Sequence, residues 1–223
     1  MDRLSSLLPG LTVDAAGVAA DRANLFVSRM ADGGYLVGPY QRGQSLFSAR
    51  LSWGPAGTRL WDGMAGMVVA PDHPLYALVM LAVAEAEAPR CGAEHLLKGY
   101  VQSLVVHLMR QAIETGAVTS GVLAGLADHR LARVLVDLHD SPEKPWRVED
   151  MAERAGMSRS AFMARFASTL GEAPASYLRR FRMERAQAEL DAGARVGAVA
   201  RRYGYGSPDA FTRALKSHAK SAA

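Results

Sequence analysis

Cysteine is almost absent from this sequence of 223 residues: Cys91 stands alone, which excludes a disulfide framework and a metal site built on paired cysteines. Long apolar runs are absent as well. The best candidate, Leu75 to Ala84, falls short of the roughly 18 uncharged residues that a membrane-spanning helix needs, and Glu85 follows it. The first ten residues contain Asp2 beside Arg3 and no apolar core, so we expect no signal peptide. We therefore expect a cytoplasmic globular protein that makes no contact with a membrane.

Histidine is scarce where a metal site would need it. No histidine precedes His73, and His95 and His107 stand twelve positions apart, too far along one helix to share an ion. The sequence also has no glycine-rich phosphate loop, and no spacing singles out a serine, a histidine and an aspartate as a catalytic set. We therefore expect no metal, no other cofactor and no enzyme activity.

Charge is unevenly distributed along the chain. The whole chain holds 26 basic and 22 acidic residues, a net charge of +4. Residues 142–223 hold fifteen of the basic and nine of the acidic residues, so they carry +6 and the remainder carries −2. A basic segment beside a mildly acidic one indicates an anionic partner, such as nucleic acid or a membrane surface.

The N-terminal third is typical of a small β-rich region. Gly33-Gly34 and the segment Gly54–Gly57 are typical of turns. Three runs beside these turns have the β-branched and aromatic character of strands: residues 25–27, 35–37 and 46–53.

A helical region follows, beginning near Pro74. It contains a predicted helix over Leu75–Glu87 and a longer one over Ala93–Thr115. The longer helix has an apolar stripe with three- and four-residue spacing, formed by Leu97, Val101, Leu104, Val105, Leu108 and Ala112. This stripe fits burial against the N-terminal region and pairing with a second copy equally well. Asp128 is suited to cap a further helix that carries Leu131 to Leu138.

Two short helices joined by a tight turn are predicted between Val148 and Leu170. Gly156 can take a positive φ at the end of the first helix, and Ser158 is a favourable N-cap for the second. Phe162 and Phe166 give the second helix an apolar stripe. Two such helices with a glycine in the turn describe a helix-turn-helix.

The same pattern returns near the end of the sequence. A short apolar face from Val196 to Ala200 precedes the turn Tyr203–Gly206, and Ser207 and Pro208 then suit the start of another helix. A longer helix, predicted over Pro174–Asp191, separates the two units. If it fixes the units relative to each other, their second helices could enter successive major grooves, roughly 34 Å apart.

At these positions the sequence resembles the DNA-binding domain of the AraC/XylS family, over about residues 128–216. The first half of the family domain is matched by Pro145–Ala152, Ala155–Phe162 and Gly171–Pro174 with Tyr177-Leu178. Its linker helix is matched by Arg182-Met183 with Ala186 and Leu190. Its second half is matched by Val199-Ala200, Tyr203–Tyr205 and Phe211–Ala214. Residues 88–94 and 128–146 further resemble family members that have an N-terminal cupin-type sensor.

The resemblance implies an α+β protein in three parts. These are a reduced cupin-like β region in residues 1–73, a helical sensor or dimerisation region in residues 74–141, and an all-α domain in residues 142–223. The last part would consist of two helix-turn-helix units joined by a long helix. The implied function is that of a transcription regulator that binds specific double-stranded DNA. It would be an effector-responsive activator with a small-molecule effector, a second copy of itself and RNA polymerase as partners.

The resemblance also implies which side chains touch DNA. The base-reading positions fall on Ser160, Met163 and Ala164 in the first unit and on Asp209, Thr212 and Arg213 in the second. Arg213 is suited to a bidentate contact with guanine, and Asp209 to accepting a hydrogen bond from cytosine. Arg165 is a phosphate or base contact. Phosphate contacts are further expected from Arg159, Arg179, Ser207 and Lys216, although arginines on the linker helix fit a solvated face equally well.

The sequence departs from the family pattern in two places. Ala219 stands where a core aromatic is expected, and the closing segment of the family is not matched by residues 216–223. The β region is also short for a complete cupin barrel. The C-terminal departure motivates an alternative: a shortened family member that dimerises with a full-length regulator and antagonises it without binding DNA.

Overall fold

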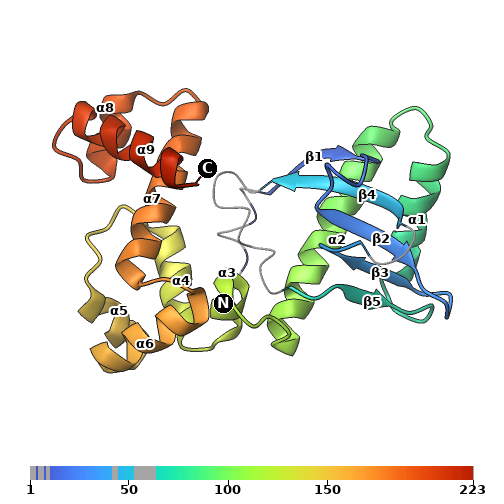
Figure 1. Cartoon of the computed structure of the whole chain (residues 1–223), viewed down its shortest axis with the longest axis horizontal. Coiled ribbons are helices and arrows are strands. Elements are labelled where there is room, and N and C mark those ends of the chain that lie inside the picture. Colours follow the sequence, from blue (N-terminus) through green and yellow to red (C-terminus); the bar gives the residue numbers. More distant parts are fainter. Residues whose placement is uncertain (1–3, 5–7, 9–10, 42–44, 53–63, 223) are drawn as a thin grey trace. The chain divides into compact units, whose positions relative to one another are not determined.

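The chain forms two compact units (Figure 1). The structure, a computed structural model, describes Leu4, Leu8 and residues 11–41, 45–52 and 64–222. The described residues between Gly10 and Thr119 form a sheet with two helices, and those from Ser120 onward form a helical unit, which confirms the predicted α+β class. The expected functional boundaries after residues 73 and 141 stay a prediction.

An antiparallel sheet is the base of the N-terminal unit. Within the described residues it has five strands in the order β1-β4-β2-β3-β5. Their bounds are β1 (Thr12–Ala16), β2 (Leu25–Arg29), β3 (Tyr35–Gly38), β4 (Ser45–Ser52) and β5 (Met67–Val69). Val27 lies opposite both Val37 and Phe47, so the three side chains share one face, and all three are buried.

The strand predictions are confirmed where they fall on described residues. β2, β3 and β4 contain the predicted runs, while Trp53 and the predicted turn at residues 54–57 lie outside the described residues. Strands β1 and β5 were not among the predicted strands. Both are short, and the two alanines in β1 have a low strand preference.

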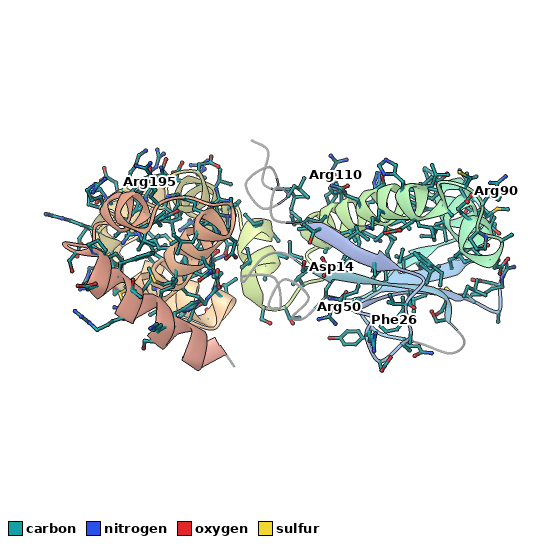
Figure 2. The ribbon with its side chains drawn as sticks, turned by 90° about the horizontal axis from the view of Figure 1, so that it is seen from above. Asp14, Phe26, Arg50, Arg90, Arg110 and Arg195 are labelled. Atoms are coloured by element: carbon teal, nitrogen blue, oxygen red, sulfur yellow. The ribbon has the colours of Figure 1, made fainter. Side chains whose placement is uncertain are left out.

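Two helices cover one face of the sheet, α1 (Tyr76–Glu87) and α2 (Ala93–Thr115). The predicted apolar stripe of α2 is buried against this unit, which decides between the two arrangements that the sequence left open. Figure 2 shows Arg110 on the outer side of the helix layer and Phe26 on the opposite side of the sheet. No helix in the described part of the chain is long and apolar enough to cross a membrane.

All regular secondary structure among the described residues of the C-terminal unit is helical. Its helices are α3 (Gly121–Ala127), α4 (Leu131–Asp140), α5 (Val148–Arg154), α6 (Arg159–Leu170), α7 (Pro174–Asp191), α8 (Val196–Arg202) and α9 (Pro208–Ala222). Helices α5 and α6 lie at one end of α7, and α8 and α9 lie at the other (Figure 1). The sequence analysis did not find α3. This helix lies close to its neighbours at Gly125, where a Cβ atom would stand 2.6 Å from side-chain carbons of Leu135 and Leu170.

Candidate nucleic-acid interface

The first helix-turn-helix unit consists of α5, a tight turn and α6. Gly156 in the turn has a φ of 62°, which a residue with a side chain rarely adopts. The Oγ atom of Ser158 accepts a hydrogen bond from the backbone N–H of Ala161 at 3.3 Å, so the predicted N-cap is confirmed. Phe162 and Phe166 are fully buried, with their ring centroids 5.5 Å apart. The opposite side of α6 is therefore left to solvent.

The second unit, α8 and α9, repeats this construction. Gly204 has a φ of 79°, and the Oγ atom of Ser207 accepts a hydrogen bond from the backbone N–H of Ala210 at 3.2 Å. Its buried residues form one apolar cluster with α7: Met183, Ala186, Val199, Ala200, Tyr203 and Phe211. The second unit therefore has a formed core. The side chain of Ala219 lies outside the described residues.

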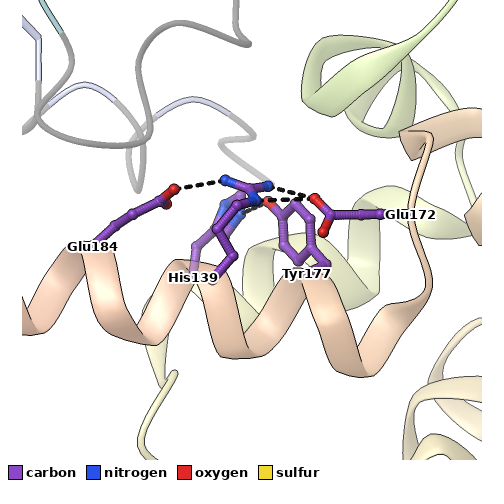
Figure 3. Close-up of polar contacts among 5 residues, drawn as sticks. His139, Glu172, Tyr177 and Glu184 are labelled. Atoms are coloured by element: carbon purple, nitrogen blue, oxygen red, sulfur yellow. Dashed lines mark hydrogen bonds and ion pairs between the residues drawn. The ribbon is translucent and has the colours of Figure 1, made fainter. Parts of the chain in front are cut away.

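A buried polar network links α7 to α4 and to Glu172, which lies between α6 and α7 (Figure 3). The Nε2 atom of His139 on α4 lies 2.5 Å from the hydroxyl oxygen of Tyr177 on α7. Desolvation by burial, with the charges of Arg185 and Arg180, lowers the pKa of His139 to about 3, so the imidazole is neutral at physiological pH.

The same network gives Arg180 two carboxylate partners. Its Nε and Nη2 atoms donate to Glu172, at 3.0 and 2.8 Å, and its Nη1 atom donates to Glu184 at 2.8 Å. Burial raises the pKa of Glu184, and the neighbouring Arg180 opposes that rise. The side chain of Arg180 is only 17% exposed, so this arginine is structural.

The outer face of α9 carries three of the six charged candidate residues. Asp209, Arg213 and Lys216 are exposed, and no hydrogen bond or ion pair involves their side chains within the described part of the chain. Thr212 donates its hydroxyl proton to the carbonyl oxygen of Pro208 at 2.8 Å, so it can offer a ligand only an acceptor and a methyl group. This face is therefore equipped to donate to and accept from base edges.

The outer face of α6 carries fewer polar and charged side chains than that of α9. Ser160 and Ala164 are exposed, and Met163 is half-buried. Two arginines frame this face, and both have carboxylate partners in the protein. Arg159 pairs with Glu149 at 2.9 Å, and the Nε atom of Arg165 lies 2.5 Å from an Oδ atom of Asp128.

Asp128, which the sequence indicated only as a helix cap, contacts a candidate site residue. Its Oδ1 atom accepts from the backbone N–H groups of Arg130 and Leu131, at 2.9 and 3.2 Å, at the start of α4. Its Oδ2 atom accepts from Arg165, which lies 37 residues away along the chain. No local pattern in the sequence could have indicated this second role.

A groove of about 340 Å³ lies beside α7, between the two helix-turn-helix units. Trp146 and Met151 of the first unit line it, as do Tyr203 and Tyr205 of the second. Its lining further includes two arginines of α7, Arg179 and Arg182, and no carboxylate among the described residues. Arg182 donates to the backbone carbonyls of Pro142 and Lys144, at 2.6 and 2.5 Å. The groove is therefore positively charged.

Comparison with known proteins identifies the helical unit. Residues 151–222 match a family model described as a helix-turn-helix domain. An AraC-like transcription regulator of Streptomyces lividans is 41% identical over 126 residues, which is 56% of this chain and 40% of the relative. One of Streptomyces antibioticus is 36% identical over 164 residues, which is 73% of this chain and 50% of the relative. This chain carries an AraC-type helix-turn-helix domain.

The chain is also similar to a regulator at lower sequence identity. The HTH-type transcriptional regulator MtrA of Neisseria gonorrhoeae is 30% identical over 146 residues, which is 63% of this chain and 48% of that protein. The chain thus spans about half the length, or less, of the curated relatives it matches. A crystal structure of ToxT from Vibrio cholerae O395 aligns over 93% of this chain and 92% of its own, with 11% identity and a TM-score of 0.41.

Proposed function

We propose that this protein is a sequence-specific DNA-binding transcription regulator. One observation carries the proposal: α7 joins two helix-turn-helix units, and each unit exposes the outer face of its second helix. Two such helices suit successive major grooves of a duplex. The names of the AraC-like relatives support a regulatory role here, rather than an enzymatic one.

The two helix-turn-helix units contribute differently to the recognition of bases. Ala164 of α6 and Arg213 of α9 occupy equivalent positions when the N-caps Ser158 and Ser207 are aligned. Arg213 can donate two hydrogen bonds to guanine, whereas Ala164 can donate none. Helix α9 therefore supplies most of the base discrimination, through Asp209, Thr212 and Arg213. Helix α6 contributes apolar contacts with thymine methyl groups and a hydroxyl, through Ser160, Met163 and Ala164.

Contacts to the DNA backbone position these helices. The positively charged groove between the units contains no described carboxylate, so Arg179 suits a phosphate that lies between the two major grooves. Arg159, Arg165, Ser207 and Lys216 flank the reading faces and suit phosphates at the groove edges. Ser207 uses its Oγ atom as an acceptor for the N-cap, which leaves its hydroxyl proton for a phosphate oxygen.

The N-terminal unit serves as a sensor in this proposal. Its antiparallel sheet, with one face covered by α1 and α2, is compatible with a reduced cupin-like region that holds a small-molecule effector. Activation of transcription, contact with RNA polymerase and a cytoplasmic location follow from the family resemblance. The proposal invokes no metal, and no group of three His, Cys, Asp or Glu side chains in the described part of the chain is placed to hold one.

A second copy of the chain is the proposed partner of α1. From Tyr76 to Ala84 this helix has no charged residue on any side, and a helix that is apolar all round is normally buried all round. Here Met80 and Leu81 are 49% and 54% exposed, and Leu96 at the start of α2 is 43% exposed. The dimer would cover these side chains, whereas the stripe of α2 is already buried within its own unit.

Binding to a mixed-sequence duplex of about 30 base pairs, measured by fluorescence anisotropy at several salt concentrations, tests the proposal. We expect saturable binding that weakens as salt rises, with a log–log slope of about −0.9 for each phosphate contacted. Absence of binding at low salt would overturn the proposal.

The alternative, a member of the family that antagonises a full-length regulator without binding DNA, is not favoured. The second unit has a buried apolar cluster, and the charged face of α9 is exposed. The same anisotropy experiment separates the two functions, because a pure antagonist would bind no duplex. It would instead form a mixed dimer with a co-expressed full-length relative.

A further inference from the structure

Arg165, at the edge of the exposed face of α6, is held by the carboxylate of Asp128, which lies just before α4. Arg165 follows Ala164 on α6, so its side chain emerges about 100° round the helix from the centre of the exposed face. There its Nε atom lies 2.5 Å from the Oδ2 atom of Asp128. The side chain of Asp128 is only 9% exposed, while that of Arg165 is 47% exposed. The pair thus has one fixed member and one that reaches solvent.

Asp128 is fixed by more than its partner arginine. Its other carboxylate oxygen accepts from two backbone N–H groups at the start of α4, those of Arg130 and Leu131. Although burial alone would raise it, the hydrogen bonds from Arg165 and from these N–H groups lower the pKa of Asp128. The carboxylate is therefore charged and held in a single orientation.

The hydrogen bond to Asp128 involves only the Nε atom of the guanidinium group. Within the described part of the chain, no hydrogen bond involves either Nη atom of Arg165. Arg180 gives the contrasting case: its Nε, Nη1 and Nη2 atoms all donate to carboxylates, and its side chain is 17% exposed. A guanidinium held through Nε alone keeps the pair of Nη groups that a phosphate accepts bidentately.

We propose that Asp128 is a positioning residue for DNA binding: it holds Arg165 through Nε so that both Nη groups of Arg165 face a backbone phosphate at the edge of the major groove that α6 enters. This inference rests on the proposed function. It gives α6, which has few polar groups on its outer face, a preformed phosphate contact that fixes its depth in the groove. The cost of immobilising a long side chain is then met in the free protein rather than on binding.

The substitution Asp128→Asn tests the inference. Asparagine keeps an Oδ1 atom for the two backbone N–H groups of α4, and it places an amide group, a donor, against the Nε–H of Arg165. We expect a Kd for the mixed-sequence duplex that rises about two- to tenfold, the loss expected when one side chain is no longer pre-ordered. Asp137→Asn is the matched control. It breaks a similar pair, in which the Nε atom of Arg154 lies 2.6 Å from Asp137, and should leave the Kd unchanged.

A double-mutant cycle with Arg165→Gln separates positioning from a general structural effect. Arg165→Gln alone should reduce the log–log salt slope by about 0.9, the value for one phosphate. Adding Asp128→Asn to Arg165→Gln should then change the Kd no further. Circular dichroism spectra and unfolding midpoints of all variants establish that each one is folded.

Several outcomes would overturn the inference. Tighter binding by Asp128→Asn would mean that the carboxylate withholds Arg165 from DNA. Equal weakening by Asp128→Asn with and without Arg165 would mean a purely structural role, and an unchanged Kd would mean no role. In each of these cases wild-type binding leaves the proposed function intact, whereas a wild-type chain that binds no duplex overturns both.

Discussion

His139 shows how a single buried residue ties the recognition units to the rest of their domain. Its ring lies 4.5 Å from that of Phe181, and its Nε2 atom contacts the hydroxyl of Tyr177. Both partners belong to α7, the helix that joins the two units. A charged imidazole at this place would have to be buried, so the domain is stable only with His139 neutral.

The stability of the domain should therefore depend on pH. The pKa of His139 is about 3 in the folded state, below the value of about 6.5 in an unfolded chain, so between these values the unfolded state binds the extra proton. The free energy of unfolding should fall as pH is lowered below about 6.5, by up to about 1.4 kcal/mol for each pH unit. Urea titrations at several pH values measure this. His139→Gln should show a shallower dependence, while the same change at the exposed His129 should leave it as in the wild type.

Arg213 is the residue on which base discrimination depends most in this account. Replacing it with alanine should relax the preference at one base position, at a cost of about 1–3 kcal/mol. Competition between duplexes that differ at single positions measures the effect. Lys216→Ala, on the same face, should weaken all duplexes alike. An unchanged sequence preference in Arg213→Ala would contradict the assignment.

Among the elements, the helices of the two helix-turn-helix units could be predicted because local chemistry specifies them. Ser158 and Ser207 cap α6 and α9, and Gly156 and Gly204 take positive φ in the turns. Each of these features depends on residues only a few positions apart, which a sequence shows directly. The candidate positions on α6 and α9 could therefore be placed on exposed faces.

Elements and contacts that depend on distant residues could not be predicted. Helix α3 has little local pattern, and its packing depends on the space that Gly125 leaves for Leu135 and Leu170. Strand β5 has three residues and is defined by its pairing with β3. The bond between Asp128 and Arg165, the groove and the network around Arg180 likewise join residues from different helices.

The core of the second unit offers a test at this scale. Phe211 is fully buried in the small apolar cluster that joins α7, α8 and α9. Phe211→Ala should cost about 3–5 kcal/mol and selectively unfold this unit. Hydrogen exchange should then show lost protection in α8 and α9, with α5 and α6 still protected. Asp209→Asn, an exposed change on the same helix, is the control. A uniform loss of protection across both units would contradict an independent second core.

At the scale of the whole molecule, the charge distribution has a structural counterpart. The net charge of +6 belongs to residues 142–223, which contain both helix-turn-helix units. The N-terminal unit instead presents exposed apolar side chains on α1 and α2. This contrast supports the proposed assignments, in which one unit binds DNA and the other associates with a second copy.

The oligomeric state tests the second of these assignments. Leu81→Lys places a charge in the proposed dimer surface and should shift the molar mass from dimer to monomer. Light scattering coupled to size-exclusion chromatography measures the mass. Val196→Lys changes a side chain that is 42% exposed on α8 and should leave the dimer intact. A wild-type chain that is monomeric at all concentrations would contradict the proposed dimer.

Selection of bound duplexes from a random-sequence pool determines whether this protein reads DNA sequence. We expect an enriched site with two conserved blocks about one helical turn apart, one strongly specified by α9 and the other weakly specified by α6. The enriched duplex should bind the full chain more tightly than a scrambled one of the same length at the same salt concentration. Equal affinity for both duplexes, or no enrichment over several rounds, would contradict a regulator that reads DNA sequence with these two helices.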